Sequence, residues 1–222
     1  MKIIEYPDRD LLSMGLADML ASELESCLLR HERASFAVPG GTSPAPIFDV
    51  LSAVDLDWSR VHVMLTDERW VPESSERSNG RLVRDRLITN RAATAQFVPF
   101  FVEGKTPDEA AGDLSDGLAD KMPISLLLLG MGADMHTASL FPGAEGLAEG
   151  LSDKAPILVP IRAEGQEPRM SVSAKALDGA MSKHLVIYGD EKRAALERAR
   201  DLPPEQAPIA AVLNELTVHW AE

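Results

Sequence analysis

Short runs of apolar residues alternate along the chain with longer stretches in which apolar positions recur at helical spacing. The short runs are typical of strands buried on both faces, and the longer stretches are typical of the helices that cover them. This alternation predicts an α/β fold, a mostly parallel sheet with helices on both faces. Strands are expected at residues 2–6, 34–38, 61–65, 96–102, 124–129, 157–160, 184–188 and at the carboxyl-terminal end.

Capping signals indicate where several of the helices begin. Asp8 is expected to cap a long first helix, whose apolar face runs to Leu28. Residues 106–109 read Thr-Pro-Asp-Glu, a capping box that opens a helix to about residue 121. After the strand at 34–38, Ser43 is expected to cap a helix through residue 54, with Pro44 at its first position. Further helices are expected at residues 81–88, 174–181, 189–200 and 209–216.

The 222 residues contain no internal repeat or linker, so we expect one domain spanning residues 1–222. No apolar run approaches the roughly 18 residues of a membrane span. The first residues are also too few and too acidic for a signal peptide, so a cytoplasmic protein is expected. The single cysteine, Cys27, cannot form an intrachain disulfide, and its place on an apolar helix face predicts core packing.

The formal net charge of -13 disfavours binding to nucleic acid or to an anionic membrane. It does not exclude a small anionic ligand. A few Arg and Lys side chains that converge with backbone N–H groups can hold a phosphate at short range, where the screened global field matters little.

A glycine turn follows the expected strand at 34–38. Gly40, Gly41, Thr42 and Ser43 lead directly into a helix. Such a junction presents unpaired N–H groups and the positive end of a helix dipole, and both favour an anion. Glycines also favour a plain strand-to-helix turn, and the sequence alone does not separate the two interpretations.

A polar cluster follows the expected strand at 61–65. Asp67, Glu68 and Arg69 come directly after this strand and before Trp70. Clusters of this kind are usually solvated ion pairs. Their position at the carboxyl end of a strand, where α/β proteins hold ligands, favours a role in a site.

The strand at 124–129 leads through Gly130 and Gly132 into a loop that contains Asp134 and His136. A histidine oriented by a carboxylate can take a proton from water near neutral pH. Taken alone, however, the pair is more often a turn in which both side chains bind backbone. Met135 occupies the third glycine position of a dinucleotide fingerprint, so nicotinamide binding is not expected. Spacings for a metal site or a serine hydrolase elbow are also lacking.

Several motifs, in their order along the chain, resemble the 6-phosphogluconolactonase family. They are Val38–Pro44, Thr66–Trp70, Ser78-Asn79, Gly130–Gly143, Pro168-Arg169 and Gly189–Lys192. The resemblance implies a Rossmann-like sheet similar to the glucosamine-6-phosphate deaminase fold. It also implies hydrolysis of 6-phospho-D-glucono-1,5-lactone to 6-phospho-D-gluconate, in the oxidative pentose phosphate pathway, without cofactor or metal. The implied partner is this phosphorylated sugar lactone, bound by a monomer or weak homo-oligomer.

The resemblance also implies a role for each matching residue. His136 would activate water, Asp134 would orient it, and Arg69 would stabilise the oxyanion. The substrate and its phosphate would be held by Gly40, Gly41, Thr42, Ser43, Asp67, Arg169 and Lys192. One position departs from the family. Met135 replaces the usual glycine, and if that glycine serves a positive φ, Met135 should be strained or the loop reshaped.

Two other functions remain open at the level of sequence. The chain is also similar to glucosamine-6-phosphate deaminases, which carry a glutamate shortly after the histidine. Phe141 occupies that place here, and this favours hydrolysis over isomerisation and deamination. A non-catalytic sugar-phosphate sensor is the third interpretation, and the presence of both Asp134 and His136 argues against it.

Overall fold

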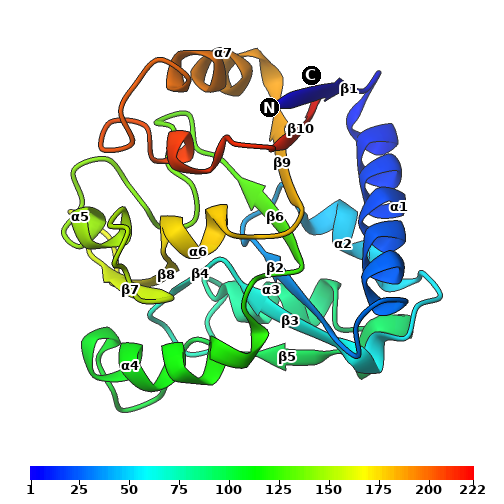
Figure 1. Ribbon diagram of the computed structural model, residues 1–222, viewed down its shortest axis with the longest axis horizontal. Helices are drawn as coiled ribbons and strands as arrows, with labels where there is room; N and C mark the ends of the chain where they lie inside the picture. The colour runs from blue at the N-terminus through cyan, green and yellow to red at the C-terminus, as the bar shows by residue number, and fades with distance from the viewer.

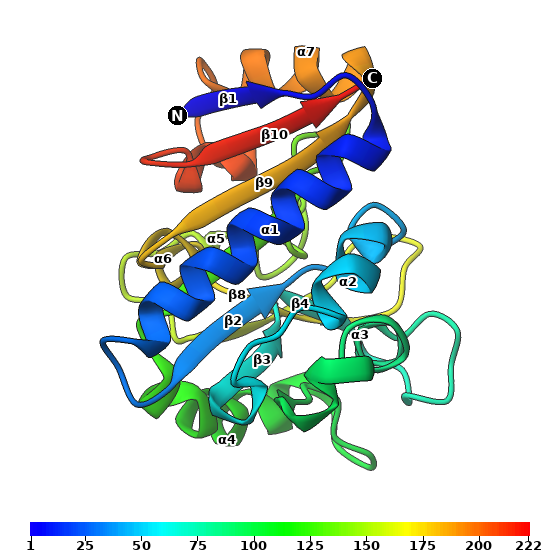
Figure 2. The ribbon, with the colours of Figure 1, turned by 90° about the vertical axis from the view of Figure 1, so that its right-hand side faces the viewer.

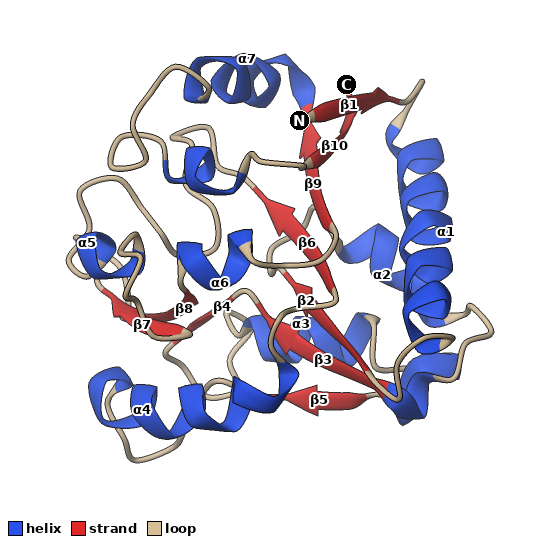
Figure 3. Ribbon diagram, in the orientation of Figure 1, coloured by secondary structure: helices blue, strands red, loops and turns tan.

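A computed structural model describes all residues from Met1 to Glu222. Its centre is a seven-stranded sheet, in which every neighbouring pair of strands is parallel (Figures 1 and 3). The strand order is β1-β10-β9-β6-β2-β3-β5. The strands are β1 (Lys2–Glu5), β2 (Ala34–Val38), β3 (Val61–Leu65), β5 (Gln96–Val98), β6 (Leu126–Gly130), β9 (Lys183–Tyr188) and β10 (Thr217–Ala221). The α/β fold with a mostly parallel sheet is therefore confirmed.

Helices cover both faces of this sheet, as Figures 1 and 2 show from two sides. In Figure 1, α1 and α2 lie to the right of the sheet, and α4 and α6 lie to its left. The helices are α1 (Arg9–Leu28), α2 (Ala45–Ser52), α3 (Asn79–Arg86), α4 (Pro107–Leu118), α5 (Leu147–Gly150), α6 (Ala174–Asp178) and α7 (Gly189–Ala199). Short 3₁₀ helices lie at Trp58–Arg60, Asn90–Thr94, Ala119–Lys121 and Pro208–Val212. No helix has the length and apolar character needed to cross a membrane.

The capping signals at Asp8 and Thr106 act as expected. The Asp8 side chain accepts a hydrogen bond from the Leu11 N–H, and Thr106 and Glu109 form a reciprocal capping box. The long α1 buries its apolar face, including Leu12, Leu16 and others at helical spacing, against the core. Local sequence is sufficient at these helix ends, because every partner lies within one turn.

Several expected boundaries are wrong. Pro44 is the N-cap of α2 rather than its first residue, and Ser43 makes no capping bond there. The 96–102 strand stops at Val98, and the helix expected at 81–88 begins at Asn79. The α3 shift has a physical cause. Ser78 caps the helix through the Arg81 N–H, and the N–H groups of Asn79 and Gly80 bind Glu68, an acceptor that helical spacing alone does not indicate.

A second, three-stranded antiparallel sheet was not predicted. It has the order β4-β8-β7, with β4 at Asp67–Arg69, β7 at Leu158–Ile161 and β8 at Arg169–Val172. β4 consists only of charged residues, so it carries no apolar pattern from which a strand could be recognised. In this sheet Arg69 pairs with Arg169. The small sheet therefore brings together two polar stretches that lie far apart in the sequence.

The strand order places a topological switch point between β2 and β6. From β2 the chain proceeds outward through β3 and β5, and it then returns to place β6 on the other side of β2. The loops that leave adjacent strands at such a point diverge and open a crevice at their carboxyl ends, where α/β proteins hold ligands. The glycine turn follows β2 and the Asp134–His136 loop follows β6. Both of these predicted motifs therefore flank this crevice.

Candidate active site

A cavity of about 270 Å³ occupies the switch point. All but one of the residues predicted for the site line it, although they come from five separate parts of the chain. They are Gly40, Gly41, Thr42, Ser43, Asp67, Arg69, His136, Arg169 and Lys192. The remaining one, Asp134, does not line the cavity but contacts His136 directly. The structure thus brings together the whole predicted set.

His136 and Asp134 form a hydrogen-bonded pair. The Nδ1 atom of His136 lies 2.5 Å from Oδ1 of Asp134, which also accepts the His136 backbone N–H at 3.2 Å. The bond from His136 lowers the pKa of the Asp134 carboxyl, so this group is an anion that can only accept. Nδ1 of His136 must then carry the proton. In the neutral ring this leaves the lone pair on Nε2, which makes no hydrogen bond within the protein.

The backbone around this pair is tightly constrained. A side chain at Gly132 would place its Cβ 2.3 Å from the His136 ring and 2.4 Å from the Asp134 carboxylate, so only glycine fits. Met135, between the two, has φ of 67°, in the left-handed region that glycine adopts more readily. The loop therefore keeps a positive φ at this position, with a methionine in place of the family's usual glycine.

Phe141 lies between the histidine and a buried arginine. The centroid of the Phe141 ring is 4.4 Å from that of the His136 ring. The Arg169 guanidinium lies over the same Phe141 ring, 5.1 Å from its centroid. A ring edge or face in this place orients the imidazole by packing. It also offers no carboxylate beside His136. The position that the sequence singled out is thus apolar and in direct contact with the histidine.

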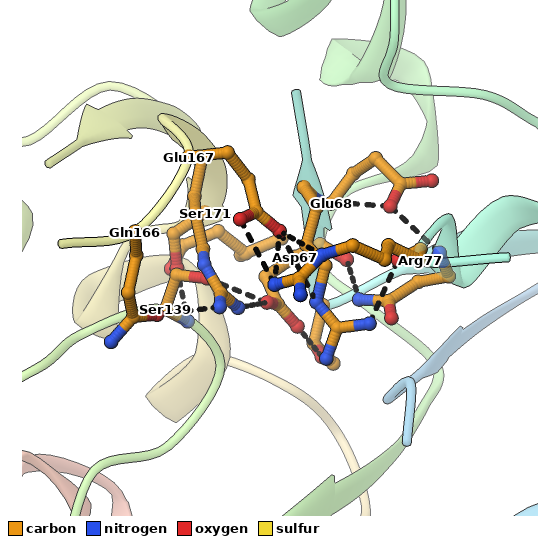
Figure 4. Close-up of polar contacts among 12 residues, drawn as sticks. Asp67, Glu68, Arg77, Ser139, Gln166, Glu167 and Ser171 are labelled. Atoms are coloured by element: carbon orange, nitrogen blue, oxygen red, sulfur yellow. Dashed lines mark hydrogen bonds and ion pairs between the residues drawn. The ribbon is translucent and has the colours of Figure 1, made fainter. Parts of the chain in front are cut away.

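Asp67 anchors a buried polar network that Figure 4 shows in close-up. It is only 6% exposed, and its Oδ2 accepts the Ser139 hydroxyl at 2.6 Å and lies 3.7 Å from Nη1 of Arg169. Arg169 is 8% exposed and also donates to the Gln166 side chain at 2.7 Å. Burial lowers the pKa of Arg169 below its ordinary value, and the Asp67 carboxylate opposes this. Asp67 therefore holds protein groups in place, and its carboxylate is already occupied.

Glu68, the next residue, points to the other side of β4 and is satisfied by four donors. It accepts the N–H groups of Arg69, Asn79 and Gly80 and the hydroxyl of Ser78, at 2.7–3.0 Å. Burial raises the pKa of this carboxyl, and the four hydrogen bonds oppose the increase. Glu68 thereby joins β4 to the first turn of α3.

The Asn79 side chain packs against the glycine turn at Gly40. It donates to the Asp67 carbonyl at 2.9 Å, and a Cβ at Gly40 would lie 1.9 Å from its Oδ1 atom. Gly40 is therefore glycine because Asn79 occupies the space of a side chain. Gly41 has φ of +84° with open space around it, so glycine is favoured there by backbone conformation alone.

Two of the three predicted cations are held by protein partners. Arg69 donates to the Arg77 carbonyl at 2.8 Å and lies 3.9 Å from Glu167, which also forms an ion pair with Arg77 (Figure 4). Arg69 and Arg169 each retain a buried Nε atom without a hydrogen-bond partner. Lys192, in the first turn of α7, makes no ion pair or hydrogen bond through its side chain. The cavity therefore contains donors available to an anion.

Sequence reasoning missed the groups that position these residues. Glu68, Ser139 and Asn79 were each noted within a motif, but none was assigned to the site. Asn79 could have been identified from its place in the Ser78-Asn79 motif. Ser171, which accepts the Ser139 N–H at 3.1 Å, gives no local signal, because it reaches the site only through the pairing of β4 with β8.

Comparisons with known proteins agree over the whole chain. The profile of a family described as glucosamine-6-phosphate isomerases/6-phosphogluconolactonase matches residues 7–220. The 6-phosphogluconolactonase of Rhizobium meliloti is 39% identical over 229 residues, covering 100% of this chain and 98% of the relative. That of Caulobacter vibrioides is 36% identical over 229 residues, covering 100% of this chain and 97% of the relative.

Solved structures give the same picture. The crystal structure of a 6-phosphogluconolactonase from Shewanella baltica superposes with a TM-score of 0.96 at 30% identity, covering 100% of this chain and 98% of that one. A monomeric glucosamine-6-phosphate deaminase superposes with a TM-score of 0.83 at 15% identity, covering 100% of this chain and 98% of that one. At that identity the second match shows a shared fold alone.

Proposed function

The chain belongs to the glucosamine-6-phosphate isomerase/6-phosphogluconolactonase family, and we propose that its cavity hydrolyses 6-phospho-D-glucono-1,5-lactone to 6-phospho-D-gluconate by histidine-activated water. The observation that carries this proposal is the His136–Asp134 pair at the cavity wall, with Nε2 of His136 free. A base with an ionised partner on its other nitrogen is the arrangement that proton transfer from water requires.

The reaction follows from this geometry. Nε2 of His136 takes a proton from water as the water oxygen bonds to the lactone carbonyl carbon. The Asp134 carboxylate stabilises the imidazolium that forms. As the tetrahedral intermediate collapses, the bond between the carbonyl carbon and the ring oxygen breaks, and His136 returns its proton to that oxygen. The products are a hydroxyl and a carboxylic acid in one open-chain sugar acid, and the carboxylic acid then loses its proton to solvent to become a carboxylate.

Arg69 and Arg169 supply positive charge at the wall of the same cavity. We assign Arg69 to the oxyanion, because its Nε lacks a hydrogen-bond partner and its guanidinium is fixed by the Arg77 carbonyl. We assign Arg169 and Lys192 to the 6-phosphate, with N–H groups of the Gly40–Ser43 turn completing the cradle. Asp67 takes a positioning role here, since its carboxylate is used by Ser139 and Arg169.

The deaminase alternative is disfavoured by Phe141. Ring opening of an amino sugar needs an acid near the histidine, and the aromatic ring of Phe141 fills that place against His136.

The substrate also bears on the cellular location of the protein. Phosphorylated sugars are charged and do not cross membranes unaided, so we propose that the protein acts in the cytoplasm on the pathway that forms this lactone.

An assay on freshly prepared lactone tests the proposal. The acid released by hydrolysis is followed in a weakly buffered pH indicator assay, with the spontaneous rate subtracted. We expect micromolar protein to accelerate hydrolysis well beyond that rate, and EDTA to leave the acceleration unchanged. His136→Ala should lower turnover by about 10²–10⁴-fold, the usual contribution of a general base. Glucosamine 6-phosphate, run in parallel, should release no ammonia.

Two outcomes would contradict this assignment. No acceleration by the unaltered protein would exclude lactone hydrolysis. Unchanged turnover of the His136→Ala variant would place the base elsewhere. An exposed histidine provides the matched control, since His31→Ala should leave turnover unchanged.

A further inference from the structure

A second cavity of about 300 Å³ lies at the amino ends of the central strands, opposite the ends that carry the active site. It forms where β2 and β3 begin and where the chain enters β6, whereas the active site lies where these strands end. β2 and β3 have five residues each, so the two cavities are separated by about 17 Å at 3.3 Å per residue. Nothing in the proposed reaction uses this second cavity.

The charged side chains that line this cavity are mainly basic, in a protein whose net charge is -13. The cations are Arg33 and Lys121, against the single carboxylate of Asp120, and the imidazoles of His31 and His62 also line the cavity. Lys121 already binds Asp120 at 2.6 Å and the Gly117 carbonyl at 2.9 Å. Arg33 is exposed, and its guanidinium makes no hydrogen bond or ion pair within the protein. The Arg33 guanidinium therefore lines the cavity without a counter-ion from the protein.

His62 is the second observation. It is the second residue of β3 and only 7% exposed, and its Nε2 atom has no hydrogen-bond partner. Burial lowers the pKa of His62, the nearby Lys121 and Arg33 lower it further, and Asp120 opposes them. His62 thus forms part of the cavity wall, and its pKa responds to charge in the cavity, because an anion that neutralises Lys121 and Arg33 would remove part of their effect.

We propose that this cavity binds a small anion bearing phosphate or carboxylate groups, held by Arg33 and Lys121 against the wall formed by His62. The volume suits a small metabolite. A guanidinium free of protein partners can bind such a group with two parallel hydrogen bonds. Asp120 offsets one positive charge and lies beside Lys121, so Arg33 provides the main attraction. Because the two cavities lie at opposite ends of the strands, the anion and the substrate bind without competition.

Histidine Cε1–H signals in NMR spectra test this proposal, since His62 and His136 report on opposite ends of the sheet. Inorganic phosphate and citrate are titrated separately, which distinguishes phosphate from carboxylate ligands. We expect a saturable shift of the His62 signal and an increase in the pKa of His62 as the anion neutralises Arg33 and Lys121. Arg33→Ala should weaken the affinity read at His62 by at least about tenfold, because it removes both charge-assisted hydrogen bonds of the guanidinium. The His136 signal, which reports anion binding in the active site, should still shift in this variant.

Arg200→Ala is the matched control, because this exposed arginine pairs only with Glu197 and lies outside both cavities. It should leave both responses unchanged. Calorimetry of phosphate binding in a Lys192→Ala background, which weakens the active-site cradle, checks the result without relying on a histidine signal. The proposal is overturned if neither anion shifts His62 saturably in the millimolar range, or if Arg33→Ala leaves the affinity at His62 unchanged.

Discussion

Met135 shows how one residue departs from its local preference without disrupting the loop around it. Its φ of 67° is unfavourable for any side chain, but hydrogen bonds hold its backbone on both sides. Its N–H donates to the Gly132 carbonyl at 3.0 Å, and its own carbonyl accepts the Ile209 N–H at 3.1 Å. The Met135 side chain, partly buried, packs against the core. Packing of this side chain offsets part of the backbone strain.

Two substitutions at this position separate strain from packing. Met135→Ala removes the side chain and keeps the strain, whereas Met135→Gly removes both. We therefore expect the glycine variant to have the larger free energy of unfolding, by about 1 kcal/mol, the usual cost of left-handed backbone for a residue with a Cβ. Denaturant unfolding of the two variants measures the difference. Equal stability, or a more stable alanine variant, would show that the loop stores no strain there.

At the scale of elements, the sequence predicted those parts of the site that depend on local pattern. The β2 and β6 strands carry apolar runs, and each leads directly into the motif that lines the cavity. β4 could not be predicted, because Asp67, Glu68 and Arg69 become a strand only by pairing with β8, about a hundred residues away. The start of α3 combines a local cap, Ser78, with acceptors supplied from β4, since the N–H groups of Asn79 and Gly80 bind Glu68.

Glu68 is the side chain on which the junction of β4 with α3 depends. In Glu68→Gln one of its two oxygens becomes an amide NH₂, which cannot accept and faces other donors. We expect this variant to lose about 1–3 kcal/mol of unfolding free energy, the cost of buried groups left unpaired. We also expect kcat/KM for the lactone to fall, because Arg69 and Asn79 are positioned by the same carboxylate.

The exposed Glu149 in α5 provides the control for this substitution. Glu149→Gln should change neither stability nor kcat/KM, since this side chain makes no hydrogen bond or ion pair. Denaturant unfolding and steady-state kinetics on both variants give the comparison. If Glu68→Gln behaves like Glu149→Gln, the carboxylate does not organise the junction.

Across the whole molecule, the alternation of strand and helix predicted a parallel sheet but not its strand order. Nothing local specifies that β1 and β10, from the two ends of the chain, pair with each other at one edge. A buried chain of hydrogen bonds supports this edge. Tyr6, His219, His184 and Glu23 are linked in that order at 2.9, 3.0 and 3.1 Å. These hydrogen bonds join β10, β9 and the residue after β1 to α1.

One arrangement of protons pairs every group in this series of hydrogen bonds. Glu23 has a lowered pKa because bonds from His184 and Ser182 outweigh its burial, so its carboxylate accepts and Nε2–H of His184 donates. Nδ1 of His184 then accepts from Nε2–H of His219, whose Nδ1 accepts the Tyr6 hydroxyl. In this arrangement each ring nitrogen has a partner. A second proton on His219 would reverse its bond to Tyr6 and place a charge at a side chain with 0% exposure.

Acid should therefore destabilise the fold through His219. Burial lowers its pKa from 6.5 to about 3. As the pH falls from 6.5 toward 3, the unfolded chain takes up a proton that the folded chain does not bind, and stability is lost across this window. One such histidine contributes at most about 1.4 kcal/mol per pH unit. The lowered pKa of His62 acts in the same direction, and that of Glu23 adds to the loss only at lower pH.

The test is the pH dependence of the unfolding free energy, compared between His219→Gln and the unaltered protein. Glutamine can donate and accept but does not titrate, so the variant loses the proton difference whatever its absolute stability. Between pH 6 and 4.5 we expect its slope to be lower by about one proton, which is about 1.4 kcal/mol per pH unit. His31→Gln, at an exposed position, should keep the original slope. Parallel curves for His219→Gln and the unaltered protein would mean that His219 binds its proton equally in both states. The acid sensitivity of the fold would then have to come from its carboxylates and from His62.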